Sequence, residues 1–465
     1  MGGFPRHSGA IDYLTYSNAG HVLCLGPTRS GKTASTMKPT LLTWPHSVIV
    51  YDPKGETWRD SAGWRHKEAH NIVLRFAPAE LHNTIAWNPF EHVRRGTPFE
   101  FRDVANIITP IADPHGKGPT DHWEPSAANL LVGVALFLGT QPCGCTLTGC
   151  LTMIDGPAHP QTGVQAWLTA MAQHSTPQIA QVGNGLLATA SRERASIIST
   201  ARRLLAIYRD PVVAKNTAHS DFRIADLMDA DRPVSLYIET RGEDELRLRP
   251  LVRLFLWLAI GQLISNTEPH RRPLIAAIDE VASLGQMEPL EMMLSKSAGS
   301  DVYGLLLTQD RADILAAYGP NERITANCHV LVAHAPNNAD TARWLSTKTG
   351  QTTVVTEEVS EAQSSGSQRS QNRSYRSVAR PVLTPDEVSR LRLPVRDAEG
   401  QITGPGETLI FQAGQHVIRG VQSLGFLDPE YRRRMAIPAP ATMRAVSRSS
   451  VVDTGRPGPG RTHLS

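Results

Sequence analysis

The sequence predicts an α/β fold in which a mainly parallel central sheet is flanked by helices and interrupted by an all-α inserted domain. Short apolar runs alternate with helical patterns in two separated parts of the chain, which is typical of doubly wound parallel sheets. A glycine-rich loop joins the first apolar run to a helix. Between the two parts lies a long stretch with helical patterns and no convincing strand.

Composition limits the classes of protein that the chain can be. Of 465 residues, 40% are hydrophobic and 20% charged, so the chain can bury a large core and hold two or more domains. Fibrous, collagenous and wholly disordered chains are excluded. The net charge is only +3, from 47 basic and 44 acidic residues, so any basic surface is local. Five scattered cysteines favour a reducing compartment, the cytosol.

The expected strands are short apolar runs that end in polar or turn-forming residues. The first part of the chain has such runs at 21–26, 47–53 and 71–76, and the second part at 233–240, 274–280, 303–310 and 329–335. Helical patterns fill residues 123–226. The apolar stretch 250–265 is shorter than the roughly 20 residues needed to cross a bilayer and contains Arg253 and Gln262, so we expect a buried helix.

Two later segments have the composition of unstructured chain. Residues 362–380 contain four Arg, no acid and many Ser and Gln, which predicts a mobile basic loop. A DNA contact is one interpretation of this loop, and a solvated linker is the other. The tail after Pro438 is rich in Pro, Gly, Ser and Arg and is expected to be disordered.

A phosphate-binding loop follows the first strand. The motif G-x-x-x-x-G-K-[ST] is matched by Gly26, Pro27, Thr28, Arg29, Ser30, Gly31, Lys32 and Thr33. Its backbone N–H groups would converge on phosphate oxygens, Lys32 would bridge the β and γ phosphates, and Thr33 would offer its hydroxyl to Mg²⁺ at the start of the helix. A chance glycine turn is the alternative. The predicted ligands are ATP and Mg²⁺.

Two acidic residues end the apolar strand 274–280. Asp279 would bind Mg²⁺ through water, and Glu280 would polarise the attacking water. Strands that merely end in surface acids are common, but the phosphate loop in the same chain favours the metal site. The next strand ends in Gln309, which could reach the γ-phosphate and sense hydrolysis, or could be a polar residue satisfied at a strand end.

Two further motifs carry less information. Residues 52–56 (DPKGE) close the second strand at the ligand-binding edge of the sheet, where the residue types alone predict only a turn. The three cysteines of CGCTLTGC have no nearby His or second Cys pair to complete a tetrahedral metal site, so small loop residues are the favoured interpretation.

With these motifs placed, residues 20–427 resemble the TraG-type coupling ATPases of type IV secretion and conjugation, which are RecA-like, FtsK-related P-loop NTPases. The segments that carry the resemblance include GPTRSGKTASTMKPTLLTWPHSVIVYDPKGE, PLIAAIDEVASLG, LLLTQD and RPVLTPDEVSRL. It implies that Lys32, Glu280 and Gln309 are catalytic and that Thr33 and Asp279 hold the metal. It also implies a nucleotide-binding domain in two parts, 1–119 and 226–435, an all-α domain at 120–225 and a disordered tail at 436–465.

The resemblance also implies partners. Such proteins form homo-hexamers at the cytoplasmic face of the membrane, receive a relaxase bound to single-stranded DNA, and drive DNA or protein effectors into the secretion channel by ATP hydrolysis. Members normally begin with transmembrane helices, whereas only 25 residues precede Gly26 here. We therefore expect a cytoplasmic chain that reaches the membrane through channel subunits or a separate membrane anchor.

A second departure concerns an arginine that some relatives insert into a neighbour's site. Residues 297–300 (SAGS) contain none, and Lys296 and Arg323 are the candidates to replace it. Two alternatives to the DNA-translocating motor stay open: an adaptor that binds nucleotide and recruits relaxase without translocation, and an FtsK-like translocase of double-stranded DNA.

Overall fold

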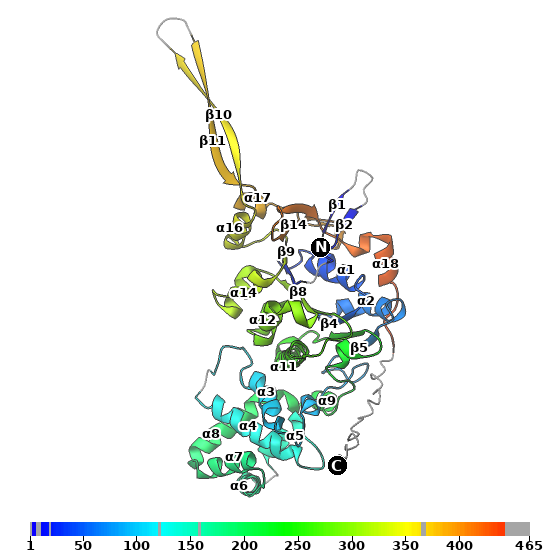
Figure 1. The fold of residues 1–465 in the computed structure, drawn as a ribbon, viewed down its shortest axis with the longest axis vertical. Coiled ribbons are helices and arrows are strands. Elements are labelled where there is room, and N and C mark those ends of the chain that lie inside the picture. Colours follow the sequence, from blue (N-terminus) through cyan, green and yellow to red (C-terminus); the bar gives the residue numbers. More distant parts are fainter. Residues whose placement is uncertain are drawn as a thin grey trace, which may run out of the picture.

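The computed structural model of the protein describes residues 2–5, 11–17, 20–119, 122–156, 160–363 and 369–441. The molecule is elongated: helices form one end, the central sheet lies in the middle, and a two-stranded hairpin projects from the other end (Figure 1). The predicted fold class is confirmed, because the sheet is mainly parallel and helices pack on both of its faces.

Among the described strands, seven parallel ones form one side of the sheet, from β9 to the edge strand β5, and correspond to the seven predicted strands. They are β3 (Val22–Leu25), β4 (Ser47–Tyr51), β5 (Ile72–Phe76), β6 (Val234–Ile238), β7 (Leu274–Ile278), β8 (Val302–Thr308) and β9 (Val330–Ala333). Their order is β9-β3-β8-β7-β4-β6-β5, so strands from the two parts of the chain interleave. Val, Ile and Leu fill these strands because both faces are covered.

Four antiparallel strands extend the sheet beyond β9, and the sequence patterns did not predict them. They are β14 (Glu407–Gln412), β15 (Ile418–Val421), β1 (Gly2–Pro5) and β2 (Ile11–Leu14). β14 pairs with β9, and the order continues through β15 and β1 to β2. The extension therefore brings the first described residues together with residues 407–421 beside the parallel strands.

The two faces of the sheet are covered by different helices. Successive side chains of a strand point to opposite faces, so Leu23 and Leu25 pack in one core and Cys24 in the other. The first core includes α11 (Asp244–Ile264) and α12 (Glu288–Ser295), and the second includes α1 (Lys38–Leu41) and α2 (Glu56–Lys67). The predicted buried helix is confirmed as α11. Among the described residues no helix is both long and apolar enough to cross a membrane.

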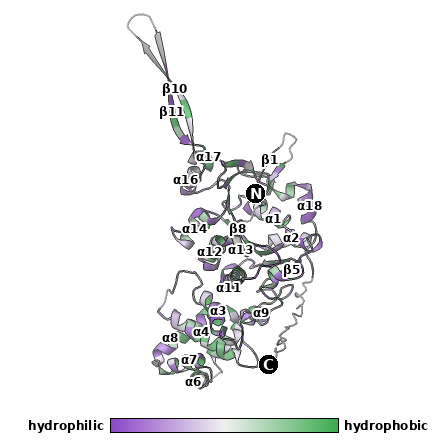
Figure 2. Cartoon of the chain, viewed as in Figure 1, coloured by the Kyte–Doolittle hydropathy of each residue, from purple (hydrophilic) through white to green (hydrophobic). Residues whose placement is uncertain are grey.

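The described residues between β5 and β6 form helices and loops but no strand. α3 (Glu100–Ala112) leads from the sheet into this part, followed by α4 (Glu124–Gly139), α5 (Leu147–Asp155), α6 (Pro160–Ala172), α7 (Pro177–Ala188), α8 (Ser191–Leu204) and α9 (Pro211–Asn216). Figure 2 shows many hydrophobic residues in this helical end of the molecule. The division into domains at 119, 225 and 435 stays a prediction.

The prediction of a mobile basic loop at 362–380 is wrong for the residues described there. β10 (Gln351–Gln363) pairs with β11 (Arg369–Pro381) in one antiparallel register, from Gln351↔Pro381 to Gln363↔Arg369. Taken alone, β11 has the composition of a solvated segment, but its partner strand contributes Thr and Val residues, which favour strands, and Glu357, which lies 3.4 Å from Arg373. Residues 364–368 lie outside the described residues.

The last described residues lie beside α2. α18 (Pro429–Met435) packs near α2, and a Cβ added to Gly63 of α2 would lie 1.9 Å from the Ile437 carbonyl oxygen. Ile437 and Pro438 therefore lie against α2. Residues 442–465 of the expected disordered tail lie outside the described residues.

Candidate functional site

The phosphate-binding loop connects β3 to a short helical turn. Gly26 N donates to the Thr308 carbonyl of the neighbouring β8 at 3.2 Å, which fixes the start of the loop. A Cβ on Gly26 would lie 2.5 Å from the Ser30 hydroxyl, so glycine is needed there. Arg29 and Gly31 have positive φ angles of 65° and 86°. Such a loop turns successive N–H groups inward and forms a concave anion site at the start of a helix.

Asp279 reaches the loop from the end of β7. Thr33 donates its hydroxyl hydrogen to Asp279 Oδ2 at 3.0 Å, although the two residues lie far apart in the sequence. Burial raises the pKa of the Asp279 carboxyl to about 6, while the nearby Lys32 ammonium opposes this shift. The hydroxyl and the carboxylate are hard oxygen donors of the kind that Mg²⁺ prefers. The pair predicted to hold the metal is thus brought together.

Glu280 lies between the loop and β8. Its backbone is left-handed, with φ 58°, a conformation that costs a non-glycine residue about 1–3 kcal/mol. One carboxylate oxygen lies 3.4 Å from Lys32 Nζ. The other accepts hydrogen bonds from Gln309 N at 3.2 Å and from the Thr308 hydroxyl at 3.4 Å. The strained backbone directs the carboxylate across the end of β8.

Gln309 completes the set of predicted residues. The Thr28 hydroxyl donates to Gln309 Oε1 at 2.7 Å, so the end of β8 contacts the loop directly. The predicted turn after β4 is also present: Asp52 accepts hydrogen bonds from Lys54 N at 3.0 Å and from Thr57 N at 2.6 Å. All the strands that carry these residues end at one edge of the sheet, the edge at which open α/β folds bind ligands.

Sequence analysis missed the residues that hold the loop from behind. The buried Gln422, which follows β15, places Nε2 2.7 Å from the Ser30 carbonyl oxygen and 2.8 Å from Nδ1 of His334, and its Oε1 accepts from Gly406 N at 3.1 Å. Burial lowers the pKa of His334 to about 4, so the ring is neutral at pH 7. Nδ1 of His334 also lies 3.2 Å from the Ser30 carbonyl oxygen, so Gln422, His334 and Ser30 lie within hydrogen-bonding distance of one another.

A third contact comes from β12 (Val395–Arg396), where the Arg396 guanidinium donates to the Arg29 carbonyl oxygen. His334 lies in a predicted strand and could have been placed at this edge. Gln422 and Arg396 carry no sequence signal, because the strands around them were not predicted.

Other candidates lie outside this cluster. Lys296 and Arg323 are exposed, at the end of α12 and just before α15 (Ile324–Asn327), and their role in a neighbour's site stays a prediction. Cys145 and Cys150 are buried with their sulfurs 3.7 Å apart. Within the described ranges no group of three or more His, Cys, Asp or Glu is placed to hold a metal ion.

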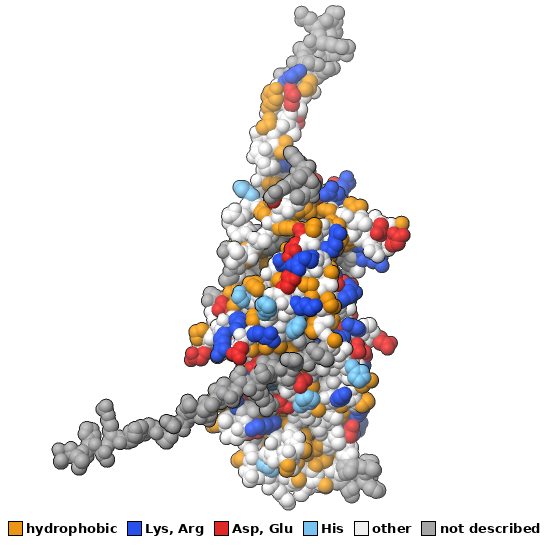
Figure 3. Space-filling view, turned by 90° about the vertical axis from the view of Figure 1, so that its right-hand side faces the viewer, with side chains coloured by type: hydrophobic (Ala, Val, Ile, Leu, Met, Phe, Trp, Pro, Cys, Tyr) orange, Lys and Arg blue, Asp and Glu red, His pale blue; other side chains and the backbone are white. Residues whose placement is uncertain are grey.

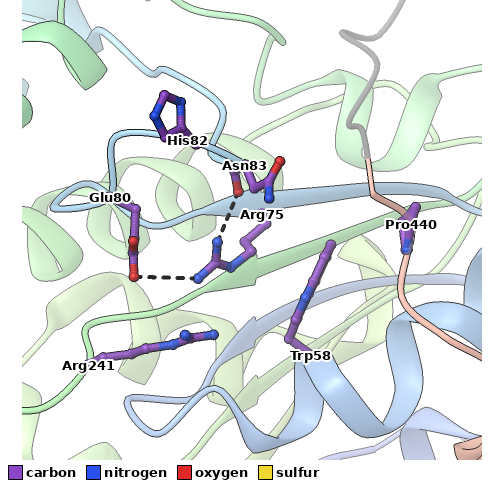
Figure 4. A pocket seen from close by; sticks show the side chains of 7 residues that line it. All are labelled: Trp58, Arg75, Glu80, His82, Asn83, Arg241 and Pro440. Atoms are coloured by element: carbon purple, nitrogen blue, oxygen red, sulfur yellow. Dashed lines mark hydrogen bonds and ion pairs between the residues drawn. The ribbon is translucent and has the colours of Figure 1, made fainter.

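A cavity of about 380 Å³ lies at the ends of β5 and β6, with β4 between it and the strands of the loop site (Figure 4). Its guanidiniums come from Arg75 and Arg241, and both donate to Glu239 Oε2, at 2.8 and 2.9 Å. Arg75 also donates to the Asn83 carbonyl oxygen at 3.0 Å. Because Glu239 and Glu80, whose carboxylate lies 3.9 Å from Arg75, already offset these two charges, the phosphate loop is the better candidate for an anionic ligand.

The sheet and the loop geometry define the class of the protein, a P-loop NTPase fold of the RecA-like type. Comparisons with known proteins agree. A family model described as type IV secretory system conjugative DNA transfer matches residues 4–449. A conjugal transfer protein TraG from Escherichia coli is 38% identical over 98% of this chain and 75% of its own length. A VirD4 protein from Agrobacterium fabrum is 23% identical over 83% of this chain and 57% of its own.

Solved structures show the same fold. Bacterial conjugative coupling protein TrwBdeltaN70 superposes with a TM-score of 0.59 at 18% identity, covering 92% of this chain and 86% of that chain. Plasmid coupling protein TrwB in complex with ADP and Mg²⁺ gives a TM-score of 0.59 at 17% identity, covering 87% and 85%. The chain therefore belongs to the type IV secretory system conjugative DNA transfer family, and its resemblance to TraG-type coupling proteins is confirmed.

Proposed function

We propose that this coupling protein binds ATP with Mg²⁺ at the phosphate loop and hydrolyses ATP to drive DNA or protein effectors into a type IV secretion channel. One observation carries the proposal: Thr33 and Lys32 of the loop contact Asp279 and Glu280 at the end of β7, at 3.0 and 3.4 Å. Elements that are distant in the sequence thus assemble a phosphate cradle beside a pair of acids. The TrwB structures, described as complexes with ADP and Mg²⁺ and with a non-hydrolysable ATP analogue, support the choice of nucleotide.

The residues present fit magnesium and a triphosphate. The Thr33 hydroxyl and the Asp279 carboxylate would hold Mg²⁺, which usually takes one or two protein oxygens and completes its shell with water and phosphate. The loop from Gly26 to Gly31 would surround the phosphates, and Thr28, Arg29 and Gly31 would offer backbone N–H groups to phosphate oxygens. Pro27 has no N–H, and the N–H groups of Gly26 and Ser30 hold the loop itself by donating to the Thr308 and Pro27 carbonyl oxygens. Bound Mg²⁺ supplies charge neutralisation for the transferred phosphoryl group.

Three side chains would act on the reaction. Lys32, whose Nζ lies 3.4 Å from Glu280, would turn from this carboxylate toward phosphate. Glu280 would then be free to orient and polarise a water molecule. Gln309 bonds the loop through Thr28 and Glu280 through its backbone N–H, so it is placed to register whether the γ-phosphate is present.

The partners follow from family membership. We propose that a relaxase with single-stranded DNA is the cargo, that channel subunits receive it, and that the working unit is a homo-hexamer attached to the cytoplasmic face of the membrane through partners, among them a separate anchor. The helical part, predicted as an all-α domain at 120–225, would contact the cargo. A pore in such a ring would confine DNA contacts, as the near-neutral chain requires.

The test compares ATP hydrolysis by the wild-type chain and by Lys32→Ala, with and without single-stranded DNA. Lys215→Ala is the matched control, because Lys215 is exposed on α9 in the helical part. We expect DNA to stimulate hydrolysis, Lys32→Ala to abolish it, and Lys215→Ala to leave it unchanged. Equal rates for wild type and Lys32→Ala would refute the site.

Two other results would favour the alternatives. A wild-type chain that binds ATP and relaxase but never turns ATP over would be a recruitment adaptor. Stimulation by double-stranded DNA alone would favour an FtsK-like translocase.

A further inference from the structure

The hairpin of β10 and β11, called the ribbon below, stands apart from the main sheet. Its two strands form a separate two-stranded sheet of 13 residues each, in register without a bulge. It projects well beyond the body of the molecule (Figure 1). Isolated two-stranded hairpins are at best marginally stable in water, so a ribbon of this length calls for a partner along it.

Charge is divided between the two strands by sign. β10 contains three Glu and no Lys or Arg, whereas β11 contains four Arg and no Asp or Glu. Glu357, Glu358, Arg373 and Arg376 are all exposed. Although Glu357 lies 3.4 Å from Arg373, their side chains remain 39% and 62% exposed. One edge of the ribbon is therefore acidic, the other is basic, and both can still meet further charges.

One face of the ribbon also exposes apolar side chains. Val355 and Val359 lie on the same face as Glu357, and Tyr375 is paired with Glu357 across the ribbon. The exposed fractions are 60% for Val355, 52% for Val359 and 68% for Tyr375. Space-filling shows basic, acidic and hydrophobic side chains close together on the ribbon (Figure 3). Such a row is typical of a surface that is covered in an assembly.

We propose that the ribbon is an interface between copies of this chain, in which the acidic β10 edge of one copy lies antiparallel to the basic β11 edge of the next. Free strand edges offer unpaired N–H and C=O groups to another strand. Two β10 edges or two β11 edges would place like charges on adjacent strands, which is unfavourable. Only the β10 to β11 contact places opposite charges there, so the contact is head to tail.

A head-to-tail contact has a geometric consequence. Each copy offers both edges, so the contact repeats from copy to copy and ends only when a ring closes. The contact covers Val355, Val359 and Tyr375 when the ribbons curve toward that face. The proposed contact joins copies of this chain and does not depend on ATP hydrolysis.

A DNA arm is the competing occupant. The arginines of β11 suit phosphate, but Glu357 and Glu358 lie within the same narrow ribbon and repel it. Copy-to-copy pairing uses both signs of charge and both edges, and so accounts for more of the ribbon.

The experiment uses the full chain in three variants that differ only in these four charges. The first carries Glu357→Arg with Glu358→Arg, the second carries Arg373→Glu with Arg376→Glu, and the full swap carries all four. Mass is measured by sedimentation velocity across a concentration series with and without ATP, and mixing of labelled copies is followed by fluorescence energy transfer.

We expect the wild type and the full swap each to assemble, because opposite edges still meet. They should not mix with each other, because wild-type β11 and swapped β10 are both basic. Each half-swapped variant should associate at least about tenfold more weakly than wild type, since attraction becomes repulsion at two or more cross-strand positions. High salt should weaken wild-type assembly, because it screens these charges.

A 1:1 mixture of the two half-swapped variants should assemble again, since one has two basic edges and the other two acidic edges. Mixing cannot restore the Glu357–Arg373 pair inside one ribbon, so recovery can come only from contact between copies. Three outcomes would overturn the proposal: a wild-type chain that stays monomeric, half-swapped variants that assemble like wild type, or a mixture that fails to recover. Lost DNA binding by the β11 variant at unchanged mass would identify a DNA arm instead.

Discussion

Replacing Gln422 should weaken nucleotide binding, although Gln422 itself lies behind the loop and would not contact the nucleotide. In Gln422→Met the side chain keeps its volume but loses the bonds to the Ser30 carbonyl oxygen, to His334 Nδ1 and to Gly406 N. His334 Nδ1 and the Ser30 carbonyl oxygen lie 3.2 Å apart and can pair with each other, which leaves the Gly406 N–H without a partner. A buried polar group left without a partner costs about 1–3 kcal/mol, and this is the expected loss of stability.

Affinity should fall for a separate reason. The bond of 2.7 Å between Gln422 and the Ser30 carbonyl oxygen holds the loop in its ligand-ready shape. Without this bond, part of the binding free energy, about 1 kcal/mol, must be used to order the loop. The affinity for nucleotide therefore falls about fivefold. The assay is equilibrium titration with a fluorescent ADP analogue in Mg²⁺, with the exposed Gln412→Met at the end of β14 as control. A folded Gln422→Met chain that binds like wild type would refute the positioning role.

Two further predictions concern the metal site and the helical part. The pKa of Asp279 is about 6 in the folded chain against an ordinary value of about 3.9, so the folded state binds this proton more tightly than the unfolded state. The free energy of unfolding that Asp279 contributes is therefore lost as the pH rises from about 4 to about 6. Since Mg²⁺ needs the carboxylate, Mg²⁺-dependent ADP affinity should fall up to tenfold per pH unit below about 6, and Asp279→Asn should abolish this dependence in titrations from pH 5 to 8. In α7, a Cβ on Gly183 would lie 2.4 Å from the backbone nitrogen of Ala172 in α6. Gly183→Ala should therefore cost about 1–3 kcal/mol in chemical unfolding, while Gly185→Ala in the same helix, where a Cβ meets nothing within 4 Å, should not destabilise.

The parallel strands could be predicted because burial on both faces leaves a local signature. β4 and β7 are runs of aliphatic residues that stop at a polar residue, and the polar residue marks the ligand edge. Since every parallel strand ends at that edge, the motif of the loop and the acids of β7 could be expected to meet. Thr33 and Asp279 lie close together because parallel strands end at the same edge, and the alternation of strands and helices in the sequence already predicts parallel strands.

The support behind the loop could not be predicted in this way. Gln422 reaches Ser30 only because β15 pairs with β14 and β14 with β9, and these antiparallel strands are short, with mixed composition. A contact across 392 positions carries no local signal. The prediction for residues 362–380 was wrong for a related reason. The composition of β11 is that of a solvated segment, and only its pairing with β10 makes it a strand.

A short stretch of chain leads from the ribbon to the phosphate loop. From Pro381 the chain passes α17 (Pro385–Ser389) and reaches Arg396, which donates to the Arg29 carbonyl oxygen of the loop. Yet the loop contacts described for Lys32, Thr33 and Ser30 are all made within one copy. The substitutions at the ribbon edges leave these contacts in place, so they should alter mass without altering the nucleotide affinity of a single copy. The chemistry of the loop and the pairing of the ribbons can thus succeed or fail separately.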